Sequence, residues 1–455
     1  MATQQSCDVA VVGAGLSGLY AARLLAAAGV DVLVLEAQTR VGGRTLTGHF
    51  RDGTFVDDGG QWVSPGQDRI VSLAQELQIE LFPSWSDGRM VLLRDGIRSV
   101  GEGPIPPNSE ANETTISAAR RLANMASDLP LDTPWTYADA PRCDAATLHQ
   151  WLAEQVDSPL AERVLSNAIE GVFARNAAPT SLLSALFWVR SGDPLVPFVA
   201  EGPVAPEHRF VGGAQQLCDK MSAGLGDRVL LGSTVTEITQ TEAAVEIIST
   251  NRVVHADRTI VTLPPTIAGR IRYSPGPPVQ RDHLCQRASM RWAIKVHCVY
   301  ANRFWAAEGL SGATMSDDGI VRITADNSPP SGAPGVLVGF IEETEALQIS
   351  SASPDERRAA VVADLVKYFG ARAADPLTYR EKHWGDDPFC RGIDGGYWSP
   401  GTWTAYGAAL RRPVGRVHWA GTETSAVWNG KMEGALLSAE RAATEVQGLV
   451  LDNTT

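Results

Sequence analysis

The sequence predicts an α/β fold with two domains, and three observations predict this class. The chain has 455 residues, whereas a single hydrophobic core stops growing near roughly 250 to 300 residues. Residues 1–36 contain a complete strand–helix–strand unit with a glycine-rich turn, and residues 416–455 contain a further strand, glycine turn and helix. The hydrophobic fraction of 44% and the charged fraction of 20% are those of an ordinary globular protein, so we expect a stable fold.

The net charge and the cysteines limit the partners of the chain. A formal charge of −13 argues against nucleic acid or an anionic membrane as a partner and favours a cationic substrate. The six cysteines are far apart, so we expect no metal site and buried free thiols. We find no targeting signal and no apolar run that approaches the ~18 residues needed to cross a bilayer. We therefore expect a cytoplasmic protein, and a homodimer is an open expectation.

The strand–helix–strand unit has the features of a dinucleotide-binding turn. Apolar runs at Asp8–Val12 and Val30–Leu35 predict two strands, and Leu19–Ala28 has helical spacing. Three glycines permit, in turn, the tight turn, the approach of backbone to a pyrophosphate and the packing of helix on strand. They are Gly13, Gly15 and Gly18. The helix N-terminus can bind phosphate, and Glu36 can accept hydrogen bonds from ribose hydroxyls. This motif alone does not separate NAD from FAD.

The C-terminal part contains a second strand–turn–helix unit. Residues 416–424 are typical of a strand that ends in a glycine turn, with Glu423 at that turn. Residues 430–435 open a helix of small and apolar residues, so another helix N-terminus faces a ligand site. The alternative is a buried helix that packs through Gly430, Gly434 and Ala435.

Two further segments indicate the cofactor. Residues 40–45 and 58–63 resemble segments of the flavin amine oxidase family, which includes bacterial monoamine oxidases and putrescine oxidases. The resemblance implies that the first segment lies along the FAD diphosphate and flavin, with Arg44 on the phosphate side. It also implies that Glu423 bonds the ribitol chain and that the Met432 N–H faces the N1 and O2 edge of the flavin, where a helix dipole stabilises negative charge. The expected cofactor-binding residues are Gly13, Gly15, Gly18, Glu36, Arg40, Gly43, Arg44, Gly60, Gln61, Trp62, Val235, Glu423 and Met432.

The resemblance covers nearly the whole chain. It implies a Rossmann-type FAD-binding domain and an α+β substrate domain with a mixed sheet and helices. Cofactor-binding sequence recurs at the start, in the middle and at the end, and the strand near Val235 should contact adenine through its backbone. We therefore expect an FAD-binding domain built from residues 1–80, 205–285 and 391–455. The substrate-binding domain is then built from residues 81–204 and 286–390.

One lysine interrupts an apolar strand, and it is a candidate catalytic residue. Period-two alternation in Trp292–Val299 places Lys295 on the same face as Ala293 and His297. By composition alone, a strand-edge lysine that reaches solvent would be favoured. The family resemblance reverses this, because it implies that Lys295 holds a water against flavin N5 and assists the reaction with oxygen. Trp384 matches a family tryptophan that packs beside the flavin, and its alternative is a core aromatic.

The chain departs from the monoamine oxidases at the substrate site. The position of the cysteine that attaches FAD falls on Ile393, so we expect noncovalent FAD, with Cys390 as a weak alternative. The two cage tyrosines fall on Asp394 and Lys431, and we place Tyr397 and Trp428 in the same pocket. Asp394 could hold the distal ammonium of a diamine or polyamine, or Lys431 could hold the carboxylate of an amino acid. The alternative is an ion pair between the two residues with no substrate contact.

The resemblance implies the oxidation of an amine. A hydride passes from the substrate to flavin N5, the imine hydrolyses, and oxygen regenerates FAD with release of hydrogen peroxide. The main alternative is an FAD-dependent oxidoreductase that acts on another substrate. A second alternative is a binding protein with this fold and no flavin chemistry, such as the Rab escort and dissociation inhibitor proteins.

Overall fold

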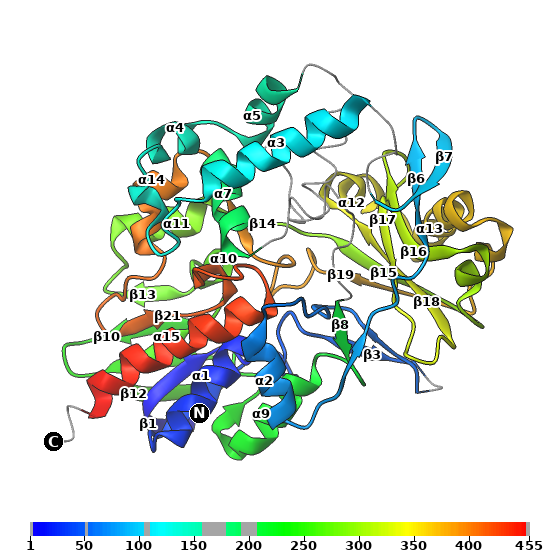
Figure 1. Ribbon diagram of the computed structural model, residues 1–455. Helices are drawn as coiled ribbons and strands as arrows, with labels where there is room; N and C mark the ends of the chain where they lie inside the picture. Colours follow the sequence, from blue (N-terminus) through cyan, green and yellow to red (C-terminus); the bar gives the residue numbers. More distant parts are fainter. Residues whose placement is uncertain (1–2, 51–52, 104–109, 157–178, 193–206, 452–455) are drawn as a thin grey trace.

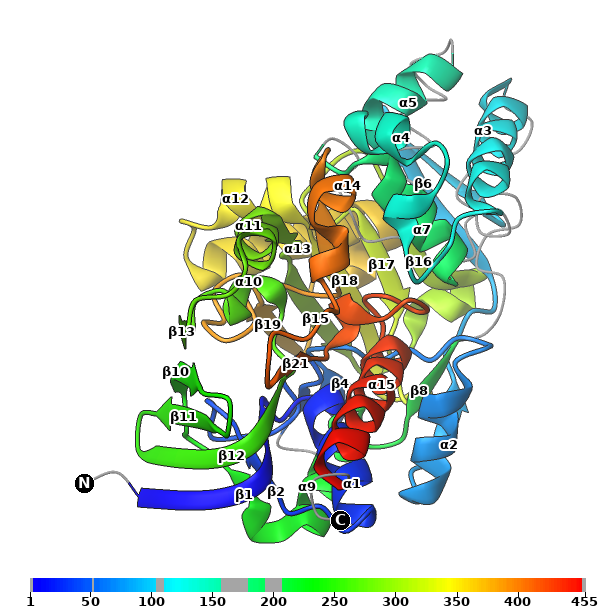
Figure 2. The same cartoon turned by 90° about the vertical axis from the view of Figure 1, so that its left-hand side faces the viewer.

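Two sheets and a helical region make up the molecule (Figures 1 and 2). The computed structural model describes residues 3–50, 53–103, 110–156, 179–192 and 207–451. Within these residues, no helix is both long and apolar enough to cross a membrane.

The first sheet contains the predicted strand–helix–strand unit. Its order is β13 (Arg272–Ser274), β10 (Val235–Gln240), β11 (Val245–Ser249), β12 (Arg252–Val261), β1 (Thr3–Val12), β2 (Val32–Leu35) and β9 (Val229–Leu230), with β21 (Val417–Trp419) paired to β12. β1 runs parallel to both β2 and β12. β1 begins earlier than the apolar run predicts, because its first residues pair with the distant start of β12, where Thr3 lies opposite Arg252.

Helices cover one face of this sheet. They are α1 (Leu16–Ala27), α2 (Asp68–Glu76), α9 (Gln216–Leu225) and α15 (Met432–Leu451). Their buried side chains share one hydrophobic cluster with β1 and β2. α1 and α15 lie side by side in both views, although they come from opposite ends of the chain (Figures 1 and 2). The opposite face packs on a second cluster that includes the short helix α10 (Pro265–Ala268).

The second sheet is mixed. Its order is β19 (Thr378–His383), β15 (Ile294–Tyr300), β18 (Gly335–Ile341), β17 (Ile323–Asp326), β16 (Leu310–Ser316), β6 (Arg89–Arg94) and β7 (Ile97–Gly101). All its pairs are antiparallel except that of β16 with β6. The helices α12 (Glu343–Ile349) and α13 (Pro354–Phe369) contribute to the cluster on this sheet. Every residue of β15 is buried.

The helical region lies above the first sheet in both views (Figures 1 and 2). It contains α3 (Glu110–Ala126), α4 (Ala140–Ala145), α5 (Leu148–Gln155), α7 (Leu182–Ser191), α11 (Val279–Arg287) and α14 (Thr402–Tyr406). Residues of these helices share one hydrophobic cluster. Three two-stranded ladders complete the strands: β3 (Thr47–His49) with β4 (Phe55–Asp57), β5 (Leu81–Pro83) with β8 (His208–Phe210), and β14 (Ala288–Met290) with β20 (Gly396–Trp398).

The predicted fold class, an α/β fold with a mixed-sheet second part, is confirmed. The predicted boundaries between the two domains stay a prediction. The segment 391–455 contributes β21 and α15 to the first sheet and its helical cover, whereas its β20 and α14 pack in the helical region.

Candidate functional site

A cavity of about 990 Å³ lies between the two sheets. Its wall combines the first turn of α1, the loops after β2 and β4, the start of α15, and residues of β15, β16 and β17. The cavity therefore joins segments from the whole length of the chain. Among the described residues, no group of three or more His, Cys, Asp or Glu side chains is arranged to hold a metal ion.

One end of the cavity is bare backbone. We call Gly13, Gly15, Gly42 and Gly43 the glycine cradle; all four line the cavity. Gly15 pairs with Gly42 in an isolated bridge, and a Cβ on Gly43 would lie 3.4 Å from the Gly15 Cα. The α1 N-terminus opens directly onto this surface, since Leu16 and Ser17 also line the cavity. A surface of free N–H groups without side chains is what a diphosphate requires.

Beyond the cradle, the wall suits a nucleoside. Glu36 at the end of β2 is 5% exposed, and its carboxylate accepts the Ala14 N–H at 2.6 Å and the Gln38 N–H at 2.9 Å. Burial raises the pKa of this carboxyl group above its ordinary value. Val235, Thr236 and Ile267 also line the cavity, and the contact of Val235 with an adenine stays a prediction.

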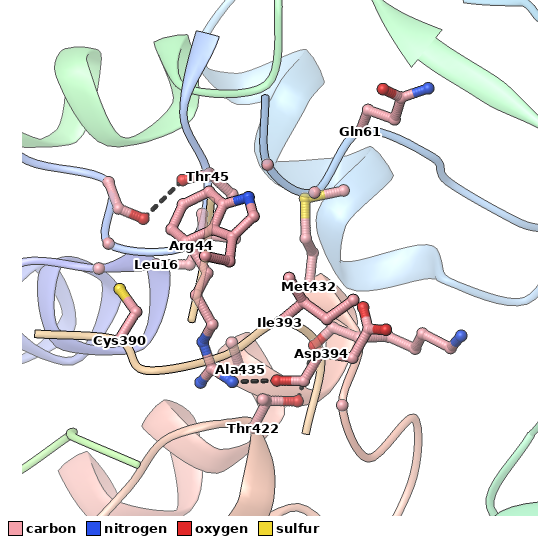
Figure 3. Close-up of a pocket in the computed structure, with 18 of the residues that line it drawn as sticks. Leu16, Arg44, Thr45, Gln61, Cys390, Ile393, Asp394, Thr422, Met432 and Ala435 are labelled. Atoms are coloured by element: carbon pink, nitrogen blue, oxygen red, sulfur yellow. Dashed lines mark hydrogen bonds between the residues drawn. The ribbon is translucent and has the colours of Figure 1, made fainter. Parts of the chain in front are cut away.

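A half-buried ion pair supports the wall of the cavity. The Arg44 guanidinium lies 2.7 Å from the carboxylate of Glu423, which is 1% exposed. Arg44 also donates to the backbone oxygen of Asp394 (Figure 3). Arg44 thus ties the loop after β2 to two segments of the C-terminal part, and it remains on the cavity wall while Glu423 lies behind it.

The N-terminus of α15 faces the cavity from below in Figure 3. Lys431, Met432 and Ala435 line the cavity. The Thr422 hydroxyl donates to the Lys431 backbone oxygen at 2.8 Å, and Glu433 accepts the backbone N–H groups of the α2 N-terminus at 2.8 and 2.9 Å. These contacts fix the helix start, whose partial positive charge is directed at the cavity.

Lys295 forms part of the wall contributed by the second sheet. β15 lies between β19 and β18, so the lysine does not reach solvent and is 4% exposed. Its Nζ donates to the Gly59 backbone oxygen at 2.8 Å and to Gln61 Oε1 at 2.7 Å. Burial lowers the pKa of the Lys295 ammonium to about 7. Its Nζ also lies 5.4 Å from the centre of the Trp62 ring, which lines the cavity.

Trp384 is held rigidly on the same wall. It is 1% exposed, and its Nε1–H donates to the Asp58 backbone oxygen at 2.7 Å. The Arg380 guanidinium donates to the Asp58 carboxylate through both Nε and a terminal nitrogen. The Lys382 ammonium lies 4.8 Å from the centre of the Trp384 ring. Trp384 is therefore both a core aromatic and a lining residue of the cavity.

Three side chains form a charged cluster (Arg291, Glu342 and Asp394) on the cavity wall. The Arg291 guanidinium pairs with Glu342 and lies 3.5 Å from the Asp394 carboxylate. Among the described residues, the ion-pair partner of Asp394 is thus Arg291, not Lys431, and the ion pair considered in the sequence analysis is replaced. Asp394 has a left-handed backbone with φ 44°, and Trp428 on the same wall has φ 54°. Such non-glycine conformations cost of order 1–3 kcal/mol and cluster at functional sites.

The candidate attachment positions also line the cavity. Ile393 and Cys390 are both on its wall (Figure 3). Burial raises the pKa of the Cys390 thiol to about 12. This side chain is therefore a thiol and not a nucleophilic thiolate at neutral pH.

Four predicted site residues lie off the cavity wall. They are Gly18, Arg40, Tyr397 and Glu423. Gly18 packs α1 on the turn, because a Cβ there would lie 1.9 Å from the Gly13 oxygen. Arg40 donates to the backbone oxygens of Val41 and Gly43 at 3.0 and 3.1 Å and so braces the cradle. Tyr397 packs against the hydrophobic cluster of the helical region.

The sequence analysis missed Arg291 and Glu342. Glu342 has no local signal, because it meets Arg291 only through the pairing of β15 with β18. The rarity of lysine in the chain could have pointed to part of this site. The chain has 39 basic residues, only five of which are lysines. Two of these five, Lys295 and Lys431, line this one cavity.

Comparisons with known proteins identify the family and the relatives of the chain. A model of the flavin containing amine oxidoreductase family matches residues 16–447. An L-amino acid dehydrogenase of Synechocystis sp. is 36% identical over 463 residues, which cover 99% of this chain and 97% of the relative. A probable flavin-containing monoamine oxidase A of Dictyostelium discoideum is 34% identical over 450 residues, or 98% of each chain.

Two solved structures have the same fold. One is wild-type putrescine oxidase bound to putrescine, with a TM-score of 0.91 and 31% identity over 98% of this chain and 100% of that chain. The other is cyclohexylamine oxidase from Brevibacterium oxydans IH-35A, with a TM-score of 0.92 and 31% identity over 98% of this chain and 99% of that chain.

Proposed function

Because the chain belongs to the family of flavin-containing amine oxidoreductases, we propose that it binds FAD in the cavity and oxidises the carbon–nitrogen bond of a polar amine. The observation that carries this proposal is the position of Lys295, a buried lysine on the wall of a cavity that also contains the glycine cradle and two helix N-termini. The diphosphate of FAD requires a backbone surface such as the glycine cradle, and the charge of the lysine assists the reaction of the reduced flavin with oxygen.

The residues present fit FAD. The glycine cradle and the α1 N-terminus can hold the diphosphate, Glu36 can hold the ribose, and the α15 N-terminus can stabilise negative charge on the flavin. When bound, FAD would supply the two-electron oxidation: the carbon that carries the amine would lose a hydride, and oxygen would later accept the electron pair together with two protons to give hydrogen peroxide. The resulting imine hydrolyses after release. We propose that the cofactor is held without a covalent bond.

The side chains on the cavity wall orient the substrate, provide charge near the reacting atoms and limit the access of water. Trp384 and Trp62 line the cavity with apolar ring surface, and we expect these rings to keep water away from a bound substrate. A charged Lys295 stabilises the negative charge that develops when electrons pass to oxygen. A neutral Lys295 is also chemically useful, because it can take the proton that a substrate ammonium must lose before hydride transfer.

The charged cluster favours a substrate with a second cation. Arg291 lies between two carboxylates that both line the cavity, so the three groups carry a net charge of −1 when ionised. This charge and the overall acidity of the chain favour a diamine or polyamine. The putrescine-bound structure of a relative gives a precedent for such a substrate.

An amino acid is the second candidate. Lys431 lines the same cavity and can hold a carboxylate, and one relative is an L-amino acid dehydrogenase. A dehydrogenase passes its electrons to an acceptor other than oxygen, so the acceptor must be tested together with the substrate.

The test is an anaerobic titration of the purified protein with diamines, aryl amines and amino acids while the flavin absorbance is followed. We expect bleaching by a diamine, and recovery of the absorbance with release of hydrogen peroxide when air is admitted. Bleaching that only an added dye reverses would identify a dehydrogenase. A flavin that no amine bleaches would contradict amine oxidation, and a colourless protein would favour the non-catalytic binding protein.

A further inference from the structure

Among the described residues, Lys295 has two hydrogen-bond partners, and both are acceptors. Its Nζ lies 2.8 Å from the Gly59 backbone oxygen and 2.7 Å from Gln61 Oε1. Its Nζ also lies 5.4 and 5.6 Å from the centres of the Trp62 and Phe340 rings, which line the cavity. An ammonium group has three hydrogens and no lone pair, whereas a neutral amine has two hydrogens and one lone pair. Two N–H donors therefore remain in both protonation states. Only the third position on the nitrogen differs: it holds a hydrogen in the ammonium and a lone pair in the neutral amine. We infer that this position faces the cavity that Lys295 lines.

The orientation of the Gln61 amide follows from this arrangement. A Lys295 ammonium can only donate, so Gln61 must present its oxygen to the lysine. The amide nitrogen of Gln61 then points the other way, and it donates to Asn327 Oδ1 at 2.8 Å. Gln61 and Asn327 are each 1% exposed, so water does not compete for these groups. The direction of one amide thus determines the direction of the other.

Asn327 is itself firmly held. It follows β17, and its backbone N–H donates to the Val336 oxygen at 2.7 Å. The neighbouring Asp326 carboxylate accepts hydrogen bonds from Trp305 Nε1 at 3.0 Å and Arg303 Nε at 2.7 Å. The amide nitrogen of Asn327 has no hydrogen-bond partner among the described residues. A buried donor without a partner is destabilising. The Asn327 amide therefore places its oxygen toward Gln61 although this leaves its own nitrogen without a hydrogen-bond partner among the described residues.

We propose that Gln61 and Asn327 are positioning residues for Lys295: Asn327 fixes the direction of the Gln61 amide, and Gln61 with Gly59 fixes the lysine nitrogen so that its third position faces the cavity. This inference rests on the proposed function for the reaction that Lys295 assists. It adds an explanation of how Asn327, which follows β17 of the second sheet, orients Gln61 in the loop after β4.

Other charges also face the lysine and must be separated from this effect. Asp57 and Asp58 on the loop side and Asp394 on the cavity side favour the charged form of Lys295. Arg209 disfavours it, as does burial. None of these groups is part of the hydrogen-bonded chain from Asn327 through Gln61 to Lys295, so variants of the two amides leave them in place.

The direct test is the titration of Lys295 in the oxidised, flavin-loaded protein. The chain has only five lysines, so NMR of protein labelled with ¹³C at the lysine ε-carbon gives few signals. A Lys295→Met variant identifies the one of interest. We expect Asn327→Leu to lower the Lys295 midpoint by about one pH unit, because a Gln61 amide that can turn no longer reliably accepts from the ammonium. Gln61→Leu should lower it at least as much.

The double variant Gln61→Leu/Asn327→Leu decides whether Asn327 acts through Gln61. If it does, the double variant has the midpoint of Gln61→Leu alone, and the two effects do not add. Equal shifts from Asn327→Leu with and without Gln61 would overturn the proposal, as would no shift at all. Should Asn327→Leu fail to fold, Asn327→Asp keeps the acceptor for Gln61, and its midpoint must not fall below that of the wild type.

A matched control separates positioning from general damage. Ser184→Ala also removes a buried hydrogen-bonding group: the Ser184 hydroxyl accepts the Trp403 Nε1–H at 2.9 Å and donates to the Trp398 backbone oxygen at 3.2 Å. This residue lies in the helical region. We expect the variant to lower the melting temperature without moving the Lys295 midpoint. No turnover is needed for these measurements, so they stand even if no amine bleaches the flavin. If turnover is found, the pH midpoint of flavin reoxidation should move with the NMR midpoint.

Discussion

The two ends of the cavity are built in different ways. The glycine cradle consists of backbone from residues close together in the chain, and it needs the absence of side chains. The wall around Lys295 consists of side chains from distant segments, and each is held by a specific partner. We therefore expect the first surface to suit a whole class of cofactors and the second to determine which substrate reacts.

The largest expected effect is at Gly18, which packs α1 against the cradle residue Gly13. Gly18→Ala places a Cβ 1.9 Å from the Gly13 oxygen, so we expect a loss of about 3 kcal/mol or more in stability and purified protein with little bound flavin. The flavin-to-protein absorbance ratio and the melting temperature measure this. Gly448→Ala is the matched control, because this glycine is also helical but has nothing within 4 Å of an added Cβ. It should stabilise the protein by about 0.5–1 kcal/mol, and equal losses in both variants would refute the steric argument.

A smaller effect is expected at Lys295. Lys295→Met should slow the reaction of the reduced enzyme with oxygen by on the order of 10²-fold, as when one preorganised charge is removed. In the wild type, the lysine charge is present below its pKa of about 7 and is lost as the pH rises through it. A bound anion raises that midpoint. The rate constant for reoxidation should therefore fall as the pH rises, with a midpoint at or above this value. A pH profile that is the same in wild type and variant would contradict this role.

At the substrate end, single charges should alter specificity. Hydrogen bonds to charged groups contribute about 1.5–3 kcal/mol, so Asp394→Asn should lower kcat/KM for a diamine by at least tenfold if Asp394 holds the distal ammonium. Lys431→Met should then change it little. The opposite result with amino acids would assign the carboxylate to Lys431. Unchanged profiles in both variants, measured by steady-state kinetics over the same substrate panel, would remove both residues from substrate recognition.

The smallest effect is expected at Cys390. Because burial keeps this side chain a thiol, Cys390→Ser should retain as much flavin as the wild type. Acid precipitation should release the flavin from both proteins into the supernatant. Flavin that stays with precipitated wild-type protein but not with the variant would show a covalent bond and contradict the proposal.

The sequence predicted most of the cradle and much less of the charged wall. Gly15 and Glu36 line the cavity, and both could be singled out because strand patterns and glycine spacing are local. Lys295 also lines the cavity, but its strand pattern alone favoured a lysine that reaches solvent, and only the family resemblance indicated the site. The sequence analysis considered Asp394 and Lys431 as a pair, but the pairing partner is Arg291. That contact depends on the loop before β15 meeting the loop before β20, where the Ile393 N–H donates to the Arg291 oxygen at 2.8 Å.

The sequence by itself determined the α/β class, the glycine-rich turn after β1 and the acid that follows β2. In these features a short stretch of backbone defines its own conformation, since strand, turn and helix all depend on neighbours within a few residues. Only the tertiary structure decided which side chains meet at the reacting end. Gln61 and Asn327 are separated by 266 positions in the chain, and Arg44 and Glu423 by 379. Such contacts arise from the packing of whole sheets, which no local pattern encodes.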